Sequence, residues 1–152
     1  MSRLRSPVRV KVGFGVPRHG WLPVELIAAD GLILELDVSD VPVNPLEELC
    51  STLILALQGI SARMGWHLEP AWCWLCFEWS GSTVTLIVLI SDSFNSKAEE
   101  RLRITGSVQE LVLPWYRALK RFSSRSYGAD WPAIDASKIK KLTQVVQAWK
   151  LR

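Results

Sequence analysis

Residues 21–38 have the sequence WLPVELIAADGLILELDV, and this stretch decides the fold class. Apolar side chains alternate with other residues through Trp21–Ala28 and again through Leu32–Val38, which is the period of a half-buried strand. Asp30 and Gly31 stand between the two runs, and an Asp-Gly pair is a strong signal for a tight turn because glycine accepts a positive φ. We therefore predict a β-hairpin.

The predicted hairpin has two chemically different faces. Glu25, Glu35 and Asp37 point to one of them, because successive side chains of a strand lie on opposite faces. The apolar residues of the other face form the predicted core face: Leu22, Val24, Leu26, Leu32, Leu34 and Leu36. We expect the hairpin to cover a core on one side and to present carboxylates on the other.

A helix is predicted to follow the hairpin. Asn44 suits the N-cap and Pro45 the first helical position. The helix dipole favours acidic residues in the first turn, where Glu47 and Glu48 stand. Apolar residues then recur at steps of three and four: Leu46, Leu49, Cys50, Leu53, Ile54, Leu57 and Ile60. The pattern predicts a helix that ends near Arg63 or Met64, with Gly65 just beyond it.

Alternation predicts further strands along the chain. They cover Val8–Val12, Trp66–Trp79, Thr83–Ser91 and Glu99–Thr105, and the last three form a three-strand meander. Ser107 and Glu110 make a capping box at the start of a helix that Pro114 should kink. A last helix is expected from Asp135 to the end.

The fold class expected from these elements is α+β: an antiparallel sheet, made of the hairpin and the three-strand meander, packed against about three helices. The length of 152 residues suits one globular domain, residues 1–152. The most apolar stretch, Val84–Ile90, is far too short to span a bilayer, which takes about 20 residues. We therefore expect no membrane association.

The chain carries no recognisable catalytic motif and no complete metal site. Cys73 and Cys76 form a C-x-x-C pair, but only His67 lies near them in sequence, and a structural zinc site needs four ligands. Residues three apart on a strand also point to opposite faces. We expect Cys50, Cys73 and Cys76 to be free, mostly buried thiols, with no metal and no cofactor, in a reducing compartment.

Charge is spread unevenly along the chain. The net charge is +3, but residues 1–11 carry +4, residues 12–106 carry −7 and residues 107–152 carry +6. The basic carboxyl-terminal region has two interpretations: solvated faces of two helices, or a surface that binds nucleic acid. No nucleic-acid-binding motif supports the second interpretation, so direct nucleic-acid binding is not expected.

Trp72 and Trp74 share one face of a predicted strand because they lie two residues apart. Either helices or loops cover this face, or the two indoles are exposed as anchors of a protein interface. The sequence leaves both alternatives open.

Several segments together resemble a known family. They are Trp21–Val24 before the hairpin, Ser39–Leu46 at the start of a helix, a Trp-rich strand after Glu69–Pro70, Leu113–Leu119, and a loop with Tyr127 and Trp131–Pro132. The set is similar to small bacterial immunity proteins, the partners of polymorphic or contact-dependent toxins. The resemblance implies a cytoplasmic, non-enzymatic protein that binds and blocks a cognate toxin. It carries over no functional residue, and the basic amino terminus and carboxyl-terminal half depart from the pattern.

The expected binding residues are acidic residues and apolar anchors from residues 12–106. They are Glu25, Glu35, Asp37, Asp40, Glu47 and Glu48, with Trp21, Trp72 and Trp74. Against a toxin that acts on nucleic acid, an acidic patch would steer association and occupy the site as a phosphate mimic. The alternatives are a small-ligand domain or an enzyme with a scattered site, and a nucleic-acid-binding accessory protein that uses the basic carboxyl-terminal helices.

Overall fold

The computed structural model describes residues 9–152. Its strands are β1 (Lys11–Phe14), β2 (Trp21–Ile27), β3 (Ile33–Ser39), β4 (Ala62–His67), β5 (Trp72–Ser80), β6 (Thr83–Ser91) and β7 (Glu99–Gly106). Its helices are α1 (Pro45–Leu57), α2 (Val108–Leu111), α3 (Leu113–Ser123) and α4 (Ala136–Lys150), with a short 3₁₀ turn at Gly128–Asp130. The fold is α+β, as predicted.

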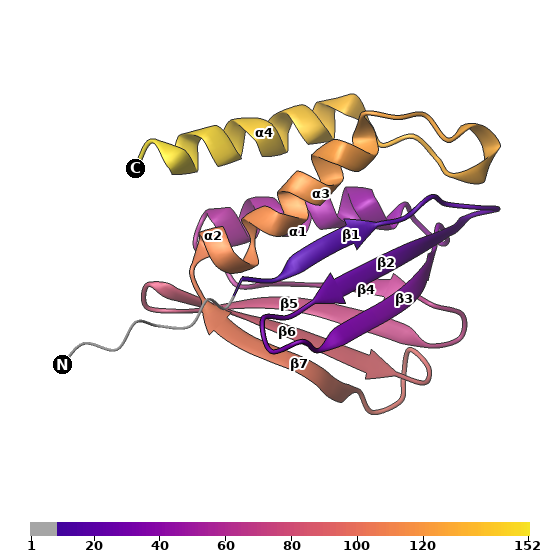
Figure 1. Ribbon diagram of the computed structural model, residues 1–152, viewed down its shortest axis with the longest axis horizontal. Coiled ribbons are helices and arrows are strands. Elements are labelled where there is room, and N and C mark those ends of the chain that lie inside the picture. Colours follow the sequence, from indigo (N-terminus) through magenta and orange to yellow (C-terminus); the bar gives the residue numbers. More distant parts are fainter. Residues whose placement is uncertain (1–8) are drawn as a thin grey trace.

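The strands form two antiparallel sheets, in the orders β1-β2-β3 and β4-β5-β6-β7 (Figure 1). The predicted strand Val8–Val12 begins outside the described residues, and within them the strand is Lys11–Phe14. It ends later than predicted because Gly13 and Phe14 pair with Glu25 and Val24 of β2.

The predicted hairpin is confirmed as β2 and β3. Asp30 accepts a hydrogen bond from the Leu32 amide at 3.0 Å, and Gly31 has φ +90° in the turn. Leu22, Val24 and Leu26 are buried. Leu34 and Leu36 are only partly buried. Leu32 is 40% exposed, so the prediction that it belongs to the core face is wrong: it lies in the turn before β3.

The sequence predicted one antiparallel sheet, whereas the structure has two, and the second has one strand more than the predicted meander. Helix α1 ends at Leu57, and Gly59 follows with φ +80°, the left-handed conformation that commonly terminates helices. The prediction of a helix that continues to Arg63 or Met64 is therefore wrong. Residues 62–67 form β4 instead, because Met64 and Trp66 bury alternate side chains while their backbone pairs with β5. The predicted strand Trp66–Trp79 is accordingly the end of β4, a turn, and β5.

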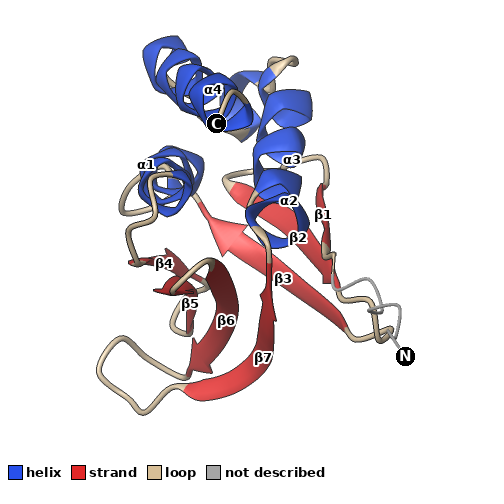
Figure 2. Cartoon of the chain, turned by 90° about the vertical axis from the view of Figure 1, so that its left-hand side faces the viewer, coloured by secondary structure: helices blue, strands red, loops and turns tan. Residues whose placement is uncertain are grey.

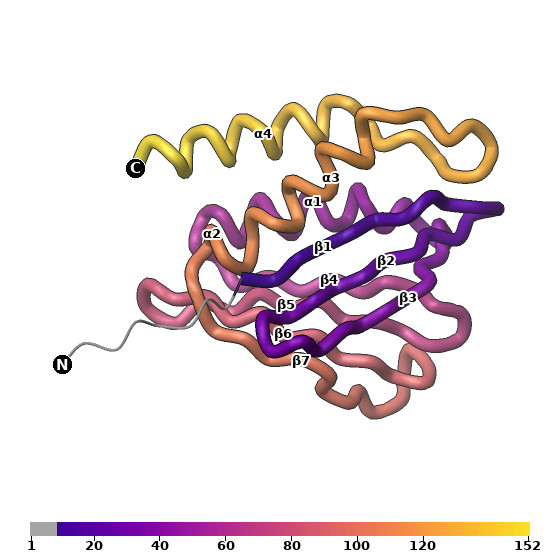
Figure 3. Tube along the Cα trace, in the orientation of Figure 1, coloured from indigo at the N-terminus to yellow at the C-terminus, as the bar shows by residue number. Residues whose placement is uncertain are grey.

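The capping box of α2 is confirmed, and the last helix begins where the sequence predicts. Ser107 Oγ accepts from the Glu110 amide at 3.2 Å, and Glu110 accepts from the Ser107 amide at 3.0 Å. Helix α2 ends at Leu111 and α3 begins at Leu113, so a break stands next to Pro114. Asp135 caps α4, which runs back over the molecule and packs against α1 (Figure 3).

The core joins both sheets to the helices. Helices α1, α2 and α3 lie against the sheets, and α4 lies farther out (Figure 2). Trp66 of β4 and Trp115 of α3 are both buried, with ring centroids 6.0 Å apart, and Trp66 Nε1 donates to the Pro45 carbonyl at 3.1 Å. Within residues 9–152, no helix has the length and apolar character needed to cross a membrane.

Candidate functional site

The face of β2 and β3 that points away from the core carries three carboxylates. Glu25 pairs directly with Glu35 across the two strands. Asp37, two residues farther along β3, pairs with Pro23. All three acidic residues are exposed. We call Glu25, Glu35 and Asp37 the acidic face. Strand alternation predicted this grouping, and the structure brings the three residues together as expected.

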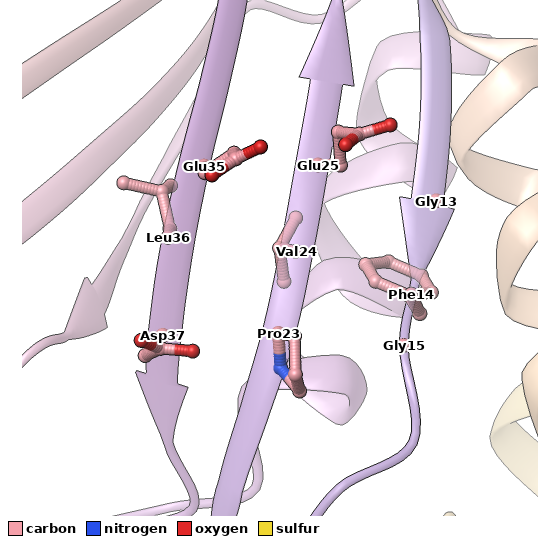
Figure 4. Close-up of a pocket in the computed structure, with 9 residues that line it drawn as sticks. All are labelled: Gly13, Phe14, Gly15, Pro23, Val24, Glu25, Glu35, Leu36 and Asp37. Atoms are coloured by element: carbon pink, nitrogen blue, oxygen red, sulfur yellow. The ribbon is translucent and has the colours of Figure 1, made fainter.

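The acidic face lines an open groove of about 580 Å³ (Figure 4). Gly13, opposite Glu25 on β1, adds no side chain and so leaves the space next to Glu25 free, and Gly15 follows β1 beside Pro23. A second groove, of about 650 Å³, shares Pro23 and Asp37 with the first. The two grooves therefore form one continuous surface.

The second groove adds apolar side chains to this surface. Its lining includes Val16, Trp21 and Leu68, together with the base Arg18. Trp21 is 38% exposed, which is unusual for so large an apolar side chain. The predicted anchor Trp21 thus lies next to Asp37, at one end of the acidic face.

The acidic face has no ion pair in the described part of the chain. Within residues 9–152, none of its three carboxylates has an ion-pair partner within 4.0 Å. Like charges directly opposite each other on neighbouring strands destabilise a sheet, and Glu25 and Glu35 stand in that relation. A basic partner would relieve this repulsion.

The other predicted acids lie elsewhere. Glu47 ties α1 to the start of α4: its Oε1 lies 3.3 Å from Lys138 Nζ, and its Oε2 accepts from the Asp135 amide at 2.9 Å. Glu48 is exposed on the first turn of α1. Asp40 is half-buried in the loop after β3, beside Gly20. The structure therefore leaves Glu25, Glu35 and Asp37 as the compact group.

Trp72 and Trp74 lie on the second sheet, in a stack of four side chains. Their rings are parallel to within 15°, with centroids 5.4 Å apart. His67 stacks on Trp72 at 4.9 Å, and the Arg63 guanidinium lies 4.6 Å from the ring centre of Trp74. We call Arg63, Trp74, Trp72 and His67 the aromatic column.

Residues of β6 and of the loop that follows it pack against the aromatic column. Phe94, from the loop after β6, packs against both indoles at 5.3 and 5.6 Å, and Trp74 Nε1 donates to Ser91 Oγ at 3.2 Å. Gly65 makes room for the rings, because a Cβ there would lie 2.6 Å from a Trp74 ring atom. Both indoles are half-buried without a helix over them. The contact with Phe94 agrees with the alternative in which a loop covers part of this face. The sequence did not single out Arg63 because β4 was not recognised, and Phe94 lies in a loop without a periodic pattern.

The thiols are buried and separated. Burial raises the pKa of Cys73 to about 12 and that of Cys50 to about 11. Cys73 belongs to the core, whereas Cys76 lies on the opposite face of β5, paired with Arg63. The described part of the chain brings together no group of three or more His, Cys, Asp or Glu side chains that could hold a metal ion.

The basic residues of the carboxyl-terminal helices lie at the surface, away from the aromatic column. Arg117, Lys120, Lys140 and Lys141 are exposed on α3 and α4. Comparison of the chain with protein-family models, with curated proteins and with solved structures gives no match.

Proposed function

We propose that this protein is a non-enzymatic immunity protein, which binds a cognate toxin in the bacterial cytoplasm through the acidic face. The observation that carries the proposal is the presence of three exposed carboxylates on two neighbouring strands, none with an ion-pair partner within residues 9–152. The resemblance noted in the sequence supports the toxin as the class of partner.

The chemistry of such a toxin matches the acidic face. A toxin that cleaves nucleic acid has to hold phosphates, and proteins hold phosphates mainly with Lys and Arg. The carboxylates of Glu25, Glu35 and Asp37 would occupy that basic site in place of phosphates. Their joint field would also steer the two proteins together, which raises the association rate more than the lifetime of the complex.

Trp21 supplies the apolar contact that a tight complex needs. A few aromatic or Arg residues carry most of the binding energy in protein interfaces, and Trp is the most enriched of them. Trp21 and Val16 line the groove that continues from Asp37, so a toxin on the acidic face would contact them. The exposed fraction of Val16 is 65%.

The groove suits protein binding better than catalysis. Catalytic carboxylates are usually buried or lie in a closed site that excludes water. Glu25, Glu35 and Asp37 are exposed in an open groove. These features support a binding role for the three residues.

The test uses the product of the gene directly upstream of this one as the toxin. The double variant Glu35→Lys/Asp37→Lys reverses charge on the acidic face, and Asp92→Lys/Glu99→Lys makes the same change outside it. Stopped-flow mixing at low and high salt measures the association rate. We expect the first variant to associate about tenfold or more slowly at low salt and to protect cells poorly from the toxin, while the control behaves as the wild type.

Equal association rates for the two variants would contradict the proposal. An upstream product that neither binds this protein nor harms cells would also count against an immunity function. Circular dichroism of both variants would show whether a loss of binding reflects a loss of folding.

A further inference from the structure

Strand β3 forms an open edge of its sheet. It pairs with β2 on one side and, within residues 9–152, with no strand on the other. The other side of β3 faces the second sheet (Figure 2), where β3 comes close to β4 without pairing with it. Ile33, the first residue of β3, is 53% exposed. An open edge presents unpaired backbone N–H and C=O groups that can pair with another chain.

The hairpin turn decides which backbone groups of β3 are free. The Ala28 amide donates to the Leu32 carbonyl at 2.9 Å, so every second residue from Leu32 onward faces β2. The backbone groups of Ile33, Glu35 and Asp37 therefore point away from β2. Pro23, which has no N–H, agrees with this pattern because its carbonyl pairs with Gly15 of the opposite neighbour.

Strands β7 and β1 carry features that protect their outer edges. Strand β7 carries a register irregularity opposite Val88 and Leu89. Its charged side chains pair with each other, Arg103 with Glu100 at 2.8 Å. Strand β1 has four residues and packs against α3. Bulges, charged side chains and short length are devices that discourage an added strand, and the charges that β3 itself carries, Glu35 and Asp37, would repel an acidic one. Strand β3 has seven residues, no register shift against β2, and no Pro or Lys.

The two faces beside this edge differ, and they define what would fit there. Glu35 and Asp37 lie on one face, without ion-pair partners in the described chain. Leu34 and Leu36 lie on the other face and are only partly buried, although they point toward the core. A strand added to β3 would place alternate side chains beside the carboxylates and over the two leucines.

We propose that β3 receives an extended segment of a partner protein as an additional strand, and that Lys or Arg alternates with apolar residues in this segment. The inference rests on the proposed function for the partner being a protein, and it adds the manner of binding and the sequence pattern of the bound segment. Main-chain hydrogen bonds would supply affinity, and the alternating side chains would supply specificity.

A second copy of the same strand fits this edge poorly. Antiparallel pairing of β3 with β3 of another molecule would bring Glu35 and Asp37 close to the same residues of the partner copy. Like charges at such positions destabilise the pairing. Charge complementarity therefore favours a basic segment.

The probe for the test is a synthetic peptide, acetyl-TKVKVKVT-amide, added to the full chain and followed by amide hydrogen exchange in NMR. We expect the amides of Ile33, Glu35 and Asp37 to exchange about tenfold or more slowly with the peptide, since they gain hydrogen bonds. The amides of Leu34 and Leu36 should not change, because they already face β2. A peptide N-methylated on its alternate, β3-facing residues keeps its charge and should give no protection.

Other outcomes separate this inference from the proposed function. Salt-sensitive shifts of Glu35 and Asp37 signals without amide protection would mean that the acidic face attracts cations but adds no strand, which overturns the inference and leaves the proposed function standing. No response at all also overturns the inference, and the toxin association test still decides the function. Protection of the three amides without peptide, together with dimers in sedimentation, would identify a second copy as the occupant and overturn it too.

Discussion

In the described part of the chain, each sheet has one face that no helix covers, and the side chains on these two faces differ in character. On β2 and β3, Glu25 and Glu35 stand opposite each other without ion-pair partners in the described chain. On β4 and β5, Trp72 and Trp74 stack on each other between Arg63 and His67. Contacts satisfied within a chain stabilise its fold, whereas charges left unpaired can interact with a partner. The comparison therefore supports the proposal that the first sheet binds a partner, while the contacts of the second sheet stabilise the fold.

The largest expected change in the free energy of unfolding comes from a substitution in the core, and it tests whether the two sheets share that core. Leu53 is fully buried on α1, which packs against α3, α4 and the second sheet. Leu53→Ala should lower the free energy of unfolding by about 2–5 kcal/mol. Leu55→Ala, on the exposed side of the same helix, should change it by less than about 0.5 kcal/mol. Urea unfolding followed by Trp fluorescence and by circular dichroism measures both, and separate transitions for the two probes would mean that the sheets unfold independently.

A matched pair of glycine substitutions compares the two faces directly. A Cβ at Gly65 would lie 2.6 Å from Trp74, whereas a Cβ at Gly13 meets no atom within 4 Å. Both residues stand in strands. Gly65→Val should therefore cost about 1–3 kcal/mol of unfolding free energy through overpacking, and Gly13→Val should be neutral or slightly stabilising. Thermal unfolding measures both changes. Equal changes in the unfolding free energy for the two variants would show that the aromatic column does not need the space above Gly65.

Alkaline pH should weaken the fold through the buried thiols. The thiol pKa is about 9 in the unfolded chain, and burial raises it to about 12 for Cys73 and about 11 for Cys50. Above pH 9 the unfolded chain binds fewer protons than the native protein, so stability falls as pH rises toward 11, by about 1 kcal/mol per pH unit for each thiol. Urea titrations between pH 8 and 10.5 measure the slope.

The variants Cys73→Ala and Cys50→Ala serve as controls for this slope. Each should make the pH dependence shallower than that of the wild type, whatever it does to stability at pH 8. A slope that is the same in both variants as in the wild type would assign the alkaline destabilisation to other groups.

The smallest expected effect concerns the like charges of the acidic face. Glu35→Gln removes one carboxylate from the pair opposite Glu25 and should raise the free energy of unfolding by about 0.2–1 kcal/mol at low salt. The gain should shrink in salt, which screens charges at the surface. Asp92→Asn is the control outside the sheet and should leave stability unchanged. A loss of stability in Glu35→Gln would mean that this carboxylate makes a stabilising contact of its own.

Short-range signals predicted much of the fold. The turn at Asp30–Gly31, the Asn44 cap and the capping box of Ser107 and Glu110 are all confirmed. Each of these devices joins groups within four residues of one another, so the amino-acid order alone contains the interaction. Strand alternation likewise placed Glu25, Glu35 and Asp37 on one face.

Pairing between distant segments decided the rest. Ile60 continues the apolar period of α1, yet the chain leaves the helix before it because β4 gains backbone partners in β5. The sequence predicted Glu47 as a binding residue. Only the fold brings Lys138 of α4 close enough to form an ion pair with it. The sequence also could not show that β3 lies at the edge of its sheet, because that depends on which strands pair with β3 once the chain has folded. Local propensity acts over a few residues, whereas these outcomes depend on contacts that exist only once the chain has folded.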